Sequence, residues 1–231
     1  DSNNMKLLHH INGTFNKEWH CNQAFFGDQY YKITDEYPLL YVSMEHKNVH
    51  STIAFRIYTK GGTYHLEEIQ TINLVFDYEE DTIYYPNSYY DFDDGLIYYG
   101  GYTENSYMRS DTNKLKYYSF PMPSYREEYY EVHTDNSIDT FTLPSETATQ
   151  GGFISHHHLY QTFSFGSKTD PLKVPVMRVV DLRNKTIIKE YKNLGEQFGV
   201  YTEFEHLALN DKGRIISLGN PFDIYEFEYK G

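Results

Sequence analysis

Short strand-like runs recur along this chain in sets of four, and this recurrence constrains the fold more than any other feature. Apolar and polar residues alternate within the runs, as is typical of half-buried strands, and no long stretch has the periodicity of an amphipathic helix. The sets span about residues 20–74, 87–144, 149–194 and 203–229, and the last contains only three runs. We therefore predict an all-β chain that forms one domain over residues 1–231.

Each set has the length of one blade of a β-propeller, in which four antiparallel strands form a small sheet. In the second set, for example, we expect strands at Ser88–Phe92, Gly95–Tyr102, Lys114–Pro121 and Ser137–Leu143. The strand missing from the last set is matched by a spare run, Met5–Ile11, which would supply it if an N-terminal strand closes the ring. A β-sandwich and an open barrel stay as alternatives, because both also contain many short strands.

Composition supports sheet structure and excludes some partners. The chain has 25 Tyr and 15 Phe, and aromatic side chains suit pleated, half-buried surfaces. Its formal net charge of −13 repels phosphate groups, so we expect neither nucleic acid nor an anionic membrane surface as a partner. We see no apolar run long enough to span a bilayer, and the single Cys21 excludes an intrachain disulfide.

The innermost strands of a propeller begin around one mouth of the central channel, so polar residues there are the candidate ligand site. These residues are His20, Asn22, Gln23, Asn87, Tyr89, Asp91, Gln150, Glu203, Glu205 and His206. Alternation places Glu203 and Glu205 on one face of a strand, where two carboxylates beside an imidazole suit a divalent cation on the axis or acid–base chemistry. The alternative is that these groups hydrogen-bond the backbones of neighbouring blades. We expect no other cofactor.

Three further clusters have simpler interpretations. The run His156-His157-His158 falls between two strands, so we interpret it as a solvated turn rather than a metal site. Asp91, Asp93 and Asp94 before Gly95 are typical of a hairpin turn and lack the spaced acidic partner of a calcium-binding loop. Paired tyrosines are expected mainly to pack between blades, with only one of each pair on a given face; they are Tyr84–Tyr85, Tyr89–Tyr90, Tyr98–Tyr99 and Tyr129–Tyr130.

Two groups of propellers resemble parts of this chain. The segments Thr149-Gln150-Gly151-Gly152 and Glu203-Phe204-Glu205-His206 resemble the last two blades of glutaminyl-cyclase-like propellers, in which Gln-Gly and Glu-x-Glu elements begin innermost strands. The segment His20-Cys21-Asn22-Gln23 resembles uncharacterised propellers of gut Bacteroidetes, which are often secreted or lipid-anchored. The resemblance implies a relative with five blades, so either this ring closes with four or a blade is missing before His20.

Function is less constrained than fold. We find no nucleophile elbow, phosphate-binding glycine loop or His-Glu-x-x-His helix. We therefore expect a non-catalytic binding module of the bacterial cell envelope that holds a carbohydrate, peptide or protein at the channel mouth. The alternatives are a glutaminyl-cyclase-like aminoacyltransferase, with Glu203 or Glu205 moving a proton, and a glycoside hydrolase.

Overall fold

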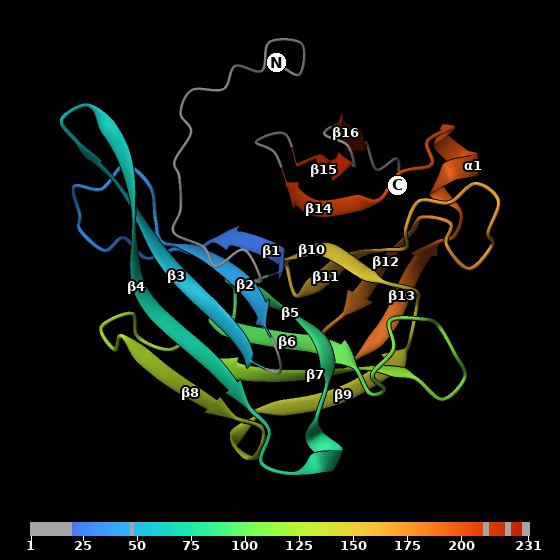
Figure 1. The fold of residues 1–231 in the computed structure, drawn as a ribbon, viewed down its shortest axis with the longest axis horizontal. Coiled ribbons are helices and arrows are strands. Elements are labelled where there is room, and N and C mark those ends of the chain that lie inside the picture. Colours follow the sequence, from blue (N-terminus) through green and yellow to red (C-terminus); the bar gives the residue numbers. More distant parts are fainter. Residues whose placement is uncertain (1–19, 47–48, 210–212, 220–222, 228–231) are drawn as a thin grey trace.

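Four small β-sheets lie in a ring around a common axis (Figure 1). The computed structural model describes residues 20–46, 49–209, 213–219 and 223–227. This is a four-bladed β-propeller arrangement, which confirms the predicted fold class and differs from the two face-packed layers of a sandwich. The spare run Met5–Ile11 lies outside the described residues.

The blades follow one another along the chain, with one exception. Blade 1 contains β1 (His20–Phe26), β2 (Leu40–His46), β3 (Val49–Lys60), β4 (Thr63–Val75) and β8 (Tyr129–His133). Blade 2 contains β5 (Tyr84–Asp91), β6 (Leu96–Tyr102), β7 (Lys114–Pro121) and β9 (Asp139–Pro144). Blade 3 contains β10 (Thr149–Ser155), β11 (His158–Phe163), β12 (Val176–Asp181) and β13 (Thr186–Tyr191). In the described residues blade 4 contains β14 (Phe204–Leu209), β15 (Ile215–Gly219) and β16 (Asp223–Phe227).

The exception is β8, which sequence analysis missed. The chain leaves blade 2 after β7, pairs β8 in parallel with β4 on the outside of blade 1, and then returns as β9. The strand has the sequence Tyr-Tyr-Glu-Val-His, and only Val132 is fully buried. Its five residues therefore show no clear alternation of apolar and polar side chains. The pairing joins residues more than fifty positions apart, such as Leu74 and Val132, and depends on contacts that local sequence does not encode.

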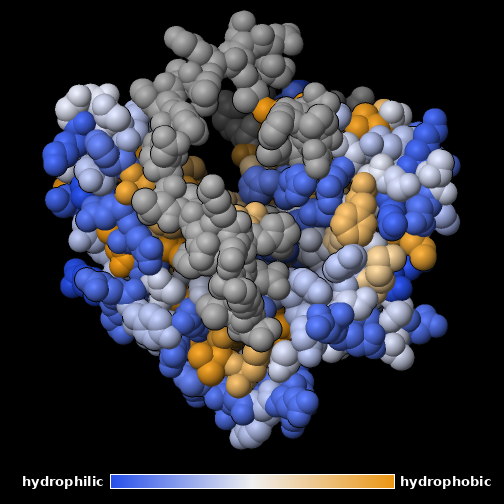
Figure 2. All heavy atoms as spheres, in the orientation of Figure 1, coloured by the Kyte–Doolittle hydropathy of each residue, from blue (hydrophilic) through white to orange (hydrophobic). Residues whose placement is uncertain are grey.

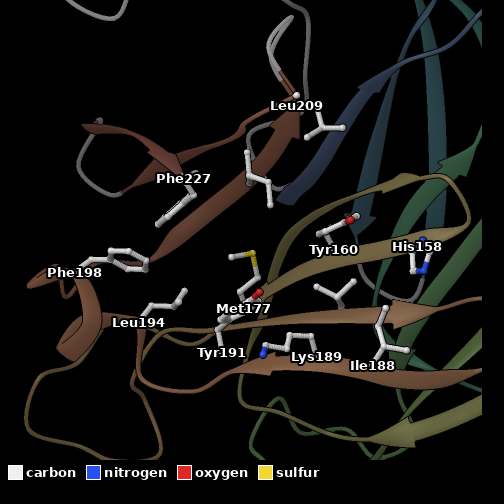
Figure 3. Close-up of a pocket in the computed structure, with 13 residues that line it drawn as sticks. His158, Tyr160, Met177, Ile188, Lys189, Tyr191, Leu194, Phe198, Leu209 and Phe227 are labelled. Atoms are coloured by element: carbon white, nitrogen blue, oxygen red, sulfur yellow. The ribbon is translucent and has the colours of Figure 1, made fainter. Parts of the chain in front are cut away.

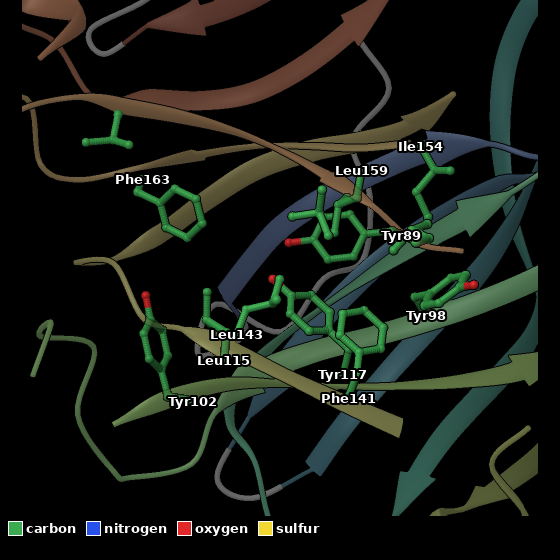
Figure 4. Packing of buried hydrophobic residues seen from close by; sticks show 13 residues of the cluster. Tyr89, Tyr98, Tyr102, Leu115, Tyr117, Phe141, Leu143, Ile154, Leu159 and Phe163 are labelled. Atoms are coloured by element: carbon green, nitrogen blue, oxygen red, sulfur yellow. The ribbon is translucent and has the colours of Figure 1, made fainter. Parts of the chain in front are cut away.

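Consecutive residues of the tyrosine-rich strands pack on opposite sides of blade 2. Tyr98 and Tyr117 face blade 3, in a core cluster that also contains Leu159 and Phe163 (Figure 4). Tyr99 and Tyr118 face blade 1. Side chains alternate along a strand, so each tyrosine pair contributes one ring to each seam. This confirms the predicted packing role for the pair Tyr98–Tyr99.

A buried arginine joins blades 2 and 3 at the edge of this core. Arg178 is 1% exposed, and its guanidinium donates to the Pro144 carbonyl at 2.7 Å and to Glu190 Oε1 at 2.8 Å. The same group lies over the ring of Phe163, 5.0 Å from its centroid. A buried charge is tolerated only with partners of this kind, so the contacts fix the relative position of the two blades.

Helical structure in the described residues is short. The helix α1 (Leu194–Phe198) connects blades 3 and 4, and the Asn193 side chain caps it by accepting from the Glu196 amide. Two 3-10 turns, η1 (Glu79–Asp81) and η2 (Thr134–Asn136), lie in loops. No helix in this part of the chain has the length and apolar character needed to cross a membrane. The face seen down the axis is mostly hydrophilic, as the net charge of −13 leads one to expect (Figure 2).

Blade 1 buries a histidine that has to stay neutral. His50 on β3 is 8% exposed, its ring packs edge-on against Phe76, and its Nδ1 atom has no hydrogen-bond partner among the described residues. Burial lowers the pKa of His50 to about 4. An unfolded histidine has a pKa of about 6.5, so below that pH the unfolded state binds the proton more readily.

We predict that the free energy of unfolding falls as pH decreases from about 6.5 to about 4, with His50 contributing on the order of 3 kcal/mol of the loss. Urea unfolding at several pH values measures this. His50→Leu removes the titrating group and should flatten that part of the profile. His156→Asn, which changes a side chain that is 91% exposed, should not. A decline of equal size in His50→Leu and the parent would contradict the assignment.

Candidate functional site

The four innermost strands meet at the axis, and each contains the same irregularity. The strand β1 contacts β5, β10 and β14, and β10 contacts β5 and β14. Each strand has one extra residue near its start relative to its neighbour in the blade, so its register shifts there. The first paired residues after the shift are equivalent in the four blades: Gln23, Asn87, Gly152 and His206. A bulge of this kind re-aims side chains, here around the axis.

Gln23 links three blades across the axis. Its amide nitrogen donates to the Gly152 carbonyl, and its Oε1 atom accepts from the Gly152 amide at 3.1 Å. His206 Nδ1 lies 3.2 Å from the same oxygen. An amide oxygen can only accept, so His206 carries its hydrogen on Nδ1. Burial lowers the pKa of His206, which keeps the ring neutral in this role.

A second set of bonds lies beside Gln23. The Asn87 amide donates to the Gln150 carbonyl at 3.1 Å, which joins blades 2 and 3. The Gln150 amide donates to Glu203 Oε1 at 2.7 Å, which joins blades 3 and 4. Gln150 also donates to the Ser164 carbonyl at 3.2 Å. These polar side chains therefore connect neighbouring blades in the way that buried polar groups require.

Two glycines allow the blades to come this close. A Cβ atom on Gly151 would overlap the His206 backbone, and one on Gly152 would lie 2.6 Å from the Tyr160 carbonyl oxygen. Any larger residue at these positions would push β10 away from its neighbours. The Gln-Gly element noted in the sequence thus begins an innermost strand, and its glycines serve close packing.

The structure gathers only part of the predicted site. It brings Gln23, Asn87, Gln150, Glu203 and His206 together around the axis. Glu205 is the extra residue of β14, between Phe204 and His206, so the simple alternation that we assumed for Glu203 and Glu205 is interrupted there. The side chains of His20 and Asn22 lie outside the described residues.

Tyr89 and Asp91 lie elsewhere. Tyr89 is 1% exposed, and its hydroxyl accepts from Gln161 at 2.8 Å inside the seam of blades 2 and 3. Asp91 lies four residues beyond Asn87, about 13 Å further along the strand. It faces His157 there, with the carboxylate 3.2 Å from the ring nitrogen. Of the described His, Cys, Asp and Glu residues, Asp91, Asp93 and His157 are close enough to share a metal ion.

The seam of blades 3 and 4 contains a pocket that sequence analysis did not predict. Its volume is about 660 Å³, and β11, β12, β13, α1, β14, β15 and β16 all contribute to its wall (Figure 3). The lining is mostly apolar and includes Tyr160, Met177, Leu194, Phe198, Ile215 and Phe227. Each strand supplies only one or a few of these residues, and no compact motif marks the set.

The polar groups of this pocket include a lysine, a histidine and two tyrosine hydroxyls. Lys189 and His158 are among its described lining residues, and none of these is a carboxylate. Lys189 is exposed and lies 5.4 Å from the centroid of the Tyr191 ring. In a chain with a net charge of −13, an apolar pocket whose described lining has a lysine and no acidic residue differs from the average surface.

The fold and its interior therefore define a β-propeller whose innermost strands are joined at the axis by hydrogen bonds and which has an apolar pocket of about 660 Å³ between two blades. No protein-family model matches the sequence, and no curated protein matches it. Among solved structures, the chain is similar to a mutant of NanB sialidase from Streptococcus pneumoniae, with 11% identity and a TM-score of 0.41. The similarity covers 87% of this chain and 28% of the sialidase chain.

We predict that Gln23→Leu lowers the free energy of unfolding by about 2–5 kcal/mol. The leucine has a similar size but leaves the Gly152 amide and His206 Nδ1 without their acceptor, and each unpaired buried donor costs about 1–3 kcal/mol. Urea unfolding at pH 7.5 measures the change. Gln29→Leu, at an exposed position, is the matched control and should stay within about 0.5 kcal/mol. If both variants unfold like the parent, the axis bonds are not what holds the blades together.

Proposed function

We propose that this propeller is a non-catalytic binding module and that its ligand is a peptide segment, free or part of a protein, held in the pocket between blades 3 and 4. The observation that carries the proposal is the pocket itself, with its apolar lining and a volume of about 660 Å³. Pockets of this size and character are the usual sites of ligand binding in proteins.

Exposed apolar residues at the pocket give it a driving force for association. Ile188, Phe198 and Leu209 are 51%, 54% and 43% exposed, and all three line the pocket. Complete burial of such a side chain is worth about 1.5–3 kcal/mol, so covering the exposed parts of three of them supports a stable contact. Large apolar side chains grouped in a concave site are typical of recognition surfaces.

The chemistry of the lining favours a peptide over a carbohydrate. Aliphatic and thioether side chains such as Met177, Val179 and Ile215 suit the apolar side chains of a peptide. A sugar instead presents hydroxyl groups, which require many polar partners if they are buried. Lys189 suits an acidic residue or a carboxyl terminus of the ligand, because the lining residues that the structure describes include no carboxylate.

The cellular setting of the proposal comes from the resemblance to Bacteroidetes propellers, many of which are secreted or lipid-anchored. We propose on that basis that the module works at the bacterial cell envelope. The roles observed for Gln23, Gln150 and His206 support a non-catalytic function, because each is engaged in bonds between blades.

On an array of random short peptides, we predict that the bound sequences are enriched in Leu, Ile or Phe next to Asp or Glu. Lys189→Glu reverses the charge at the pocket and should weaken binding of those peptides at least about tenfold, which corresponds to about 1.4 kcal/mol. Lys60→Glu is the matched control, because Lys60 is exposed and outside the lining. Binding to a glycan array with no binding to peptides would rule the proposal out.

A glutaminyl-cyclase-like activity is the second candidate, and it rests on the resemblance and on the position of Glu203. This carboxylate lies beside Gln150 at the start of β14, where the resemblance implies a proton-transferring residue. A glycoside hydrolase has less support, because it needs two facing carboxylates and the described lining of the pocket has none.

Incubation with a Gln-initiated peptide separates these functions. If the chain is a binding module, we predict no release of ammonia and no loss of 17 Da from the peptide. The double variant Glu203→Gln, Glu205→Gln should then behave like the parent. Ammonia release that this double variant abolishes would establish the cyclase and refute the non-catalytic proposal.

A further inference from the structure

Two turns from neighbouring blades lie side by side at the ends of the innermost strands. One is the β5–β6 turn, which follows Asp91 and includes Asp93 and Asp94. The other is the β10–β11 turn, in which His156 and His157 have left-handed backbone conformations with φ of 50° and 59°. The two turns are equivalent within their blades, so the propeller places them next to each other.

The turns bring three possible metal ligands together. Asp91, Asp93 and His157, which we call the seam cluster, each offer a ligand atom within 4.8 Å of the others. His157 Nδ1 is 3.2 Å from Asp91 Oδ2 and 3.1 Å from the neighbouring Asp94 Oδ2. Two atoms that each lie about 2.0–2.1 Å from a tetrahedral zinc ion are about 3.3 Å apart. The distances from His157 Nδ1 to Asp91 and Asp94 are compatible with ligands that share one ion, while Asp93 Oδ2 lies 3.9 Å from Nε2, the other ring nitrogen.

The seam cluster carries two carboxylates, and Asp94 adds a third beside it. Asp91 is 1% exposed, and Asp93 and Asp94 lie in the same turn. Among the described residues, the ion pairs of these three carboxylates involve only histidines. A buried carboxylate needs compensating partners, and besides His157 the Asp91 carboxylate has the Asp93 backbone amide, which donates to its Oδ1 at 3.0 Å.

A cavity beside the cluster gives an ion access and room for water. Asp94 and His157 line a pocket of about 260 Å³ between blades 2 and 3. Arg183 and Lys185 also line this pocket, and its volume has room for water molecules, each of which takes up about 30 Å³ in the liquid. The site is therefore buried on the side of Asp91 and open on the side of Asp94.

We propose that the seam cluster binds one divalent transition-metal ion, with zinc as the reference ion, and that the ion joins blades 2 and 3. Imidazole together with carboxylates is a ligand set for such ions, whereas calcium prefers oxygen ligands alone. The proposal is independent of the peptide pocket, which lies on the other side of blade 3. It also differs from a cation on the axis, because the cluster lies in the turns between two blades.

The Arg183 side chain competes with the metal ion for the His157 imidazole. Its guanidinium lies 2.6 Å from His157 Nε2. If Nδ1 binds the metal, Nε2 carries the hydrogen and no longer accepts from Arg183; if Nε2 binds it, Arg183 occupies the place of the ion. In either case the guanidinium must move when the metal binds.

Isothermal titration of the EDTA-treated 231-residue chain with zinc chloride tests the proposal. We expect one saturable site, and a higher melting temperature with zinc than without it. Asp91→Asn keeps the shape of the side chain and leaves all three histidines of the 156–158 run in place. It should weaken binding at least about tenfold.

Asp93→Asn is the second ligand variant, and it changes a side chain that is 44% exposed, so it should fold even if Asp91→Asn does not. His156→Asn is the matched control and should bind zinc like the parent. Arg183→Gln should bind zinc several-fold more tightly. Cobalt absorption spectra of the parent and of the two Asp variants provide a second readout of the ligand set.

The proposal is overturned if zinc does not bind with a stoichiometry near one. It is also overturned if both Asp variants bind like the parent, since the exposed histidine run alone then holds the ion. Unchanged affinity in Arg183→Gln would show that the His157 imidazole is not a ligand, and would overturn it as well.

Discussion

The propeller depends on a side-chain amide at its axis. Gln23 bonds the backbone of Gly152 in blade 3 and the imidazole of His206 in blade 4 from its own position in blade 1. A ring of four blades has a narrow centre, where backbone donors and acceptors of the innermost strands face one another away from water. The Gln23 side chain donates to the Gly152 carbonyl and accepts from the Gly152 amide, so both backbone groups are paired. The glycines of β10 let the strands come close enough for these bonds to form.

Outside the axis, the seams between blades are held by different means. Tyrosines from β6 and β7 fill the two sides of blade 2, and the Arg178 guanidinium joins blades 2 and 3. At the seam of blades 3 and 4, Phe204 is buried close to the axis, but the outer part of the seam is open as the apolar pocket. Binding at this seam therefore uses surface that packing within the ring does not cover.

The same geometry explains why polar clusters divide into two kinds. Those at the beginning of the innermost strands, such as Gln150 and Glu203, are bonded to each other across blades. Those in the turns at the other end, such as Asp91 and His157, lie where blades diverge and leave a cavity of about 260 Å³. Bonds between blades therefore dominate where the innermost strands begin, and the charged cluster with a cavity beside it lies where they end.

The sequence by itself determined the all-β class, the blade units and most strand positions, because alternation and turn residues are local signals. The bounds predicted for β7, Lys114–Pro121, are those of the structure. It also located Gln23, Gln150 and His206 near one another. Only the tertiary structure showed that Asp91 lies next to His157 and away from the residues at the axis. It also showed that β8 pairs with blade 1 and that a pocket forms around Met177. The reason is physical: those outcomes depend on which blades become neighbours and how closely they pack, and contacts between distant segments leave no periodic trace in any one of them.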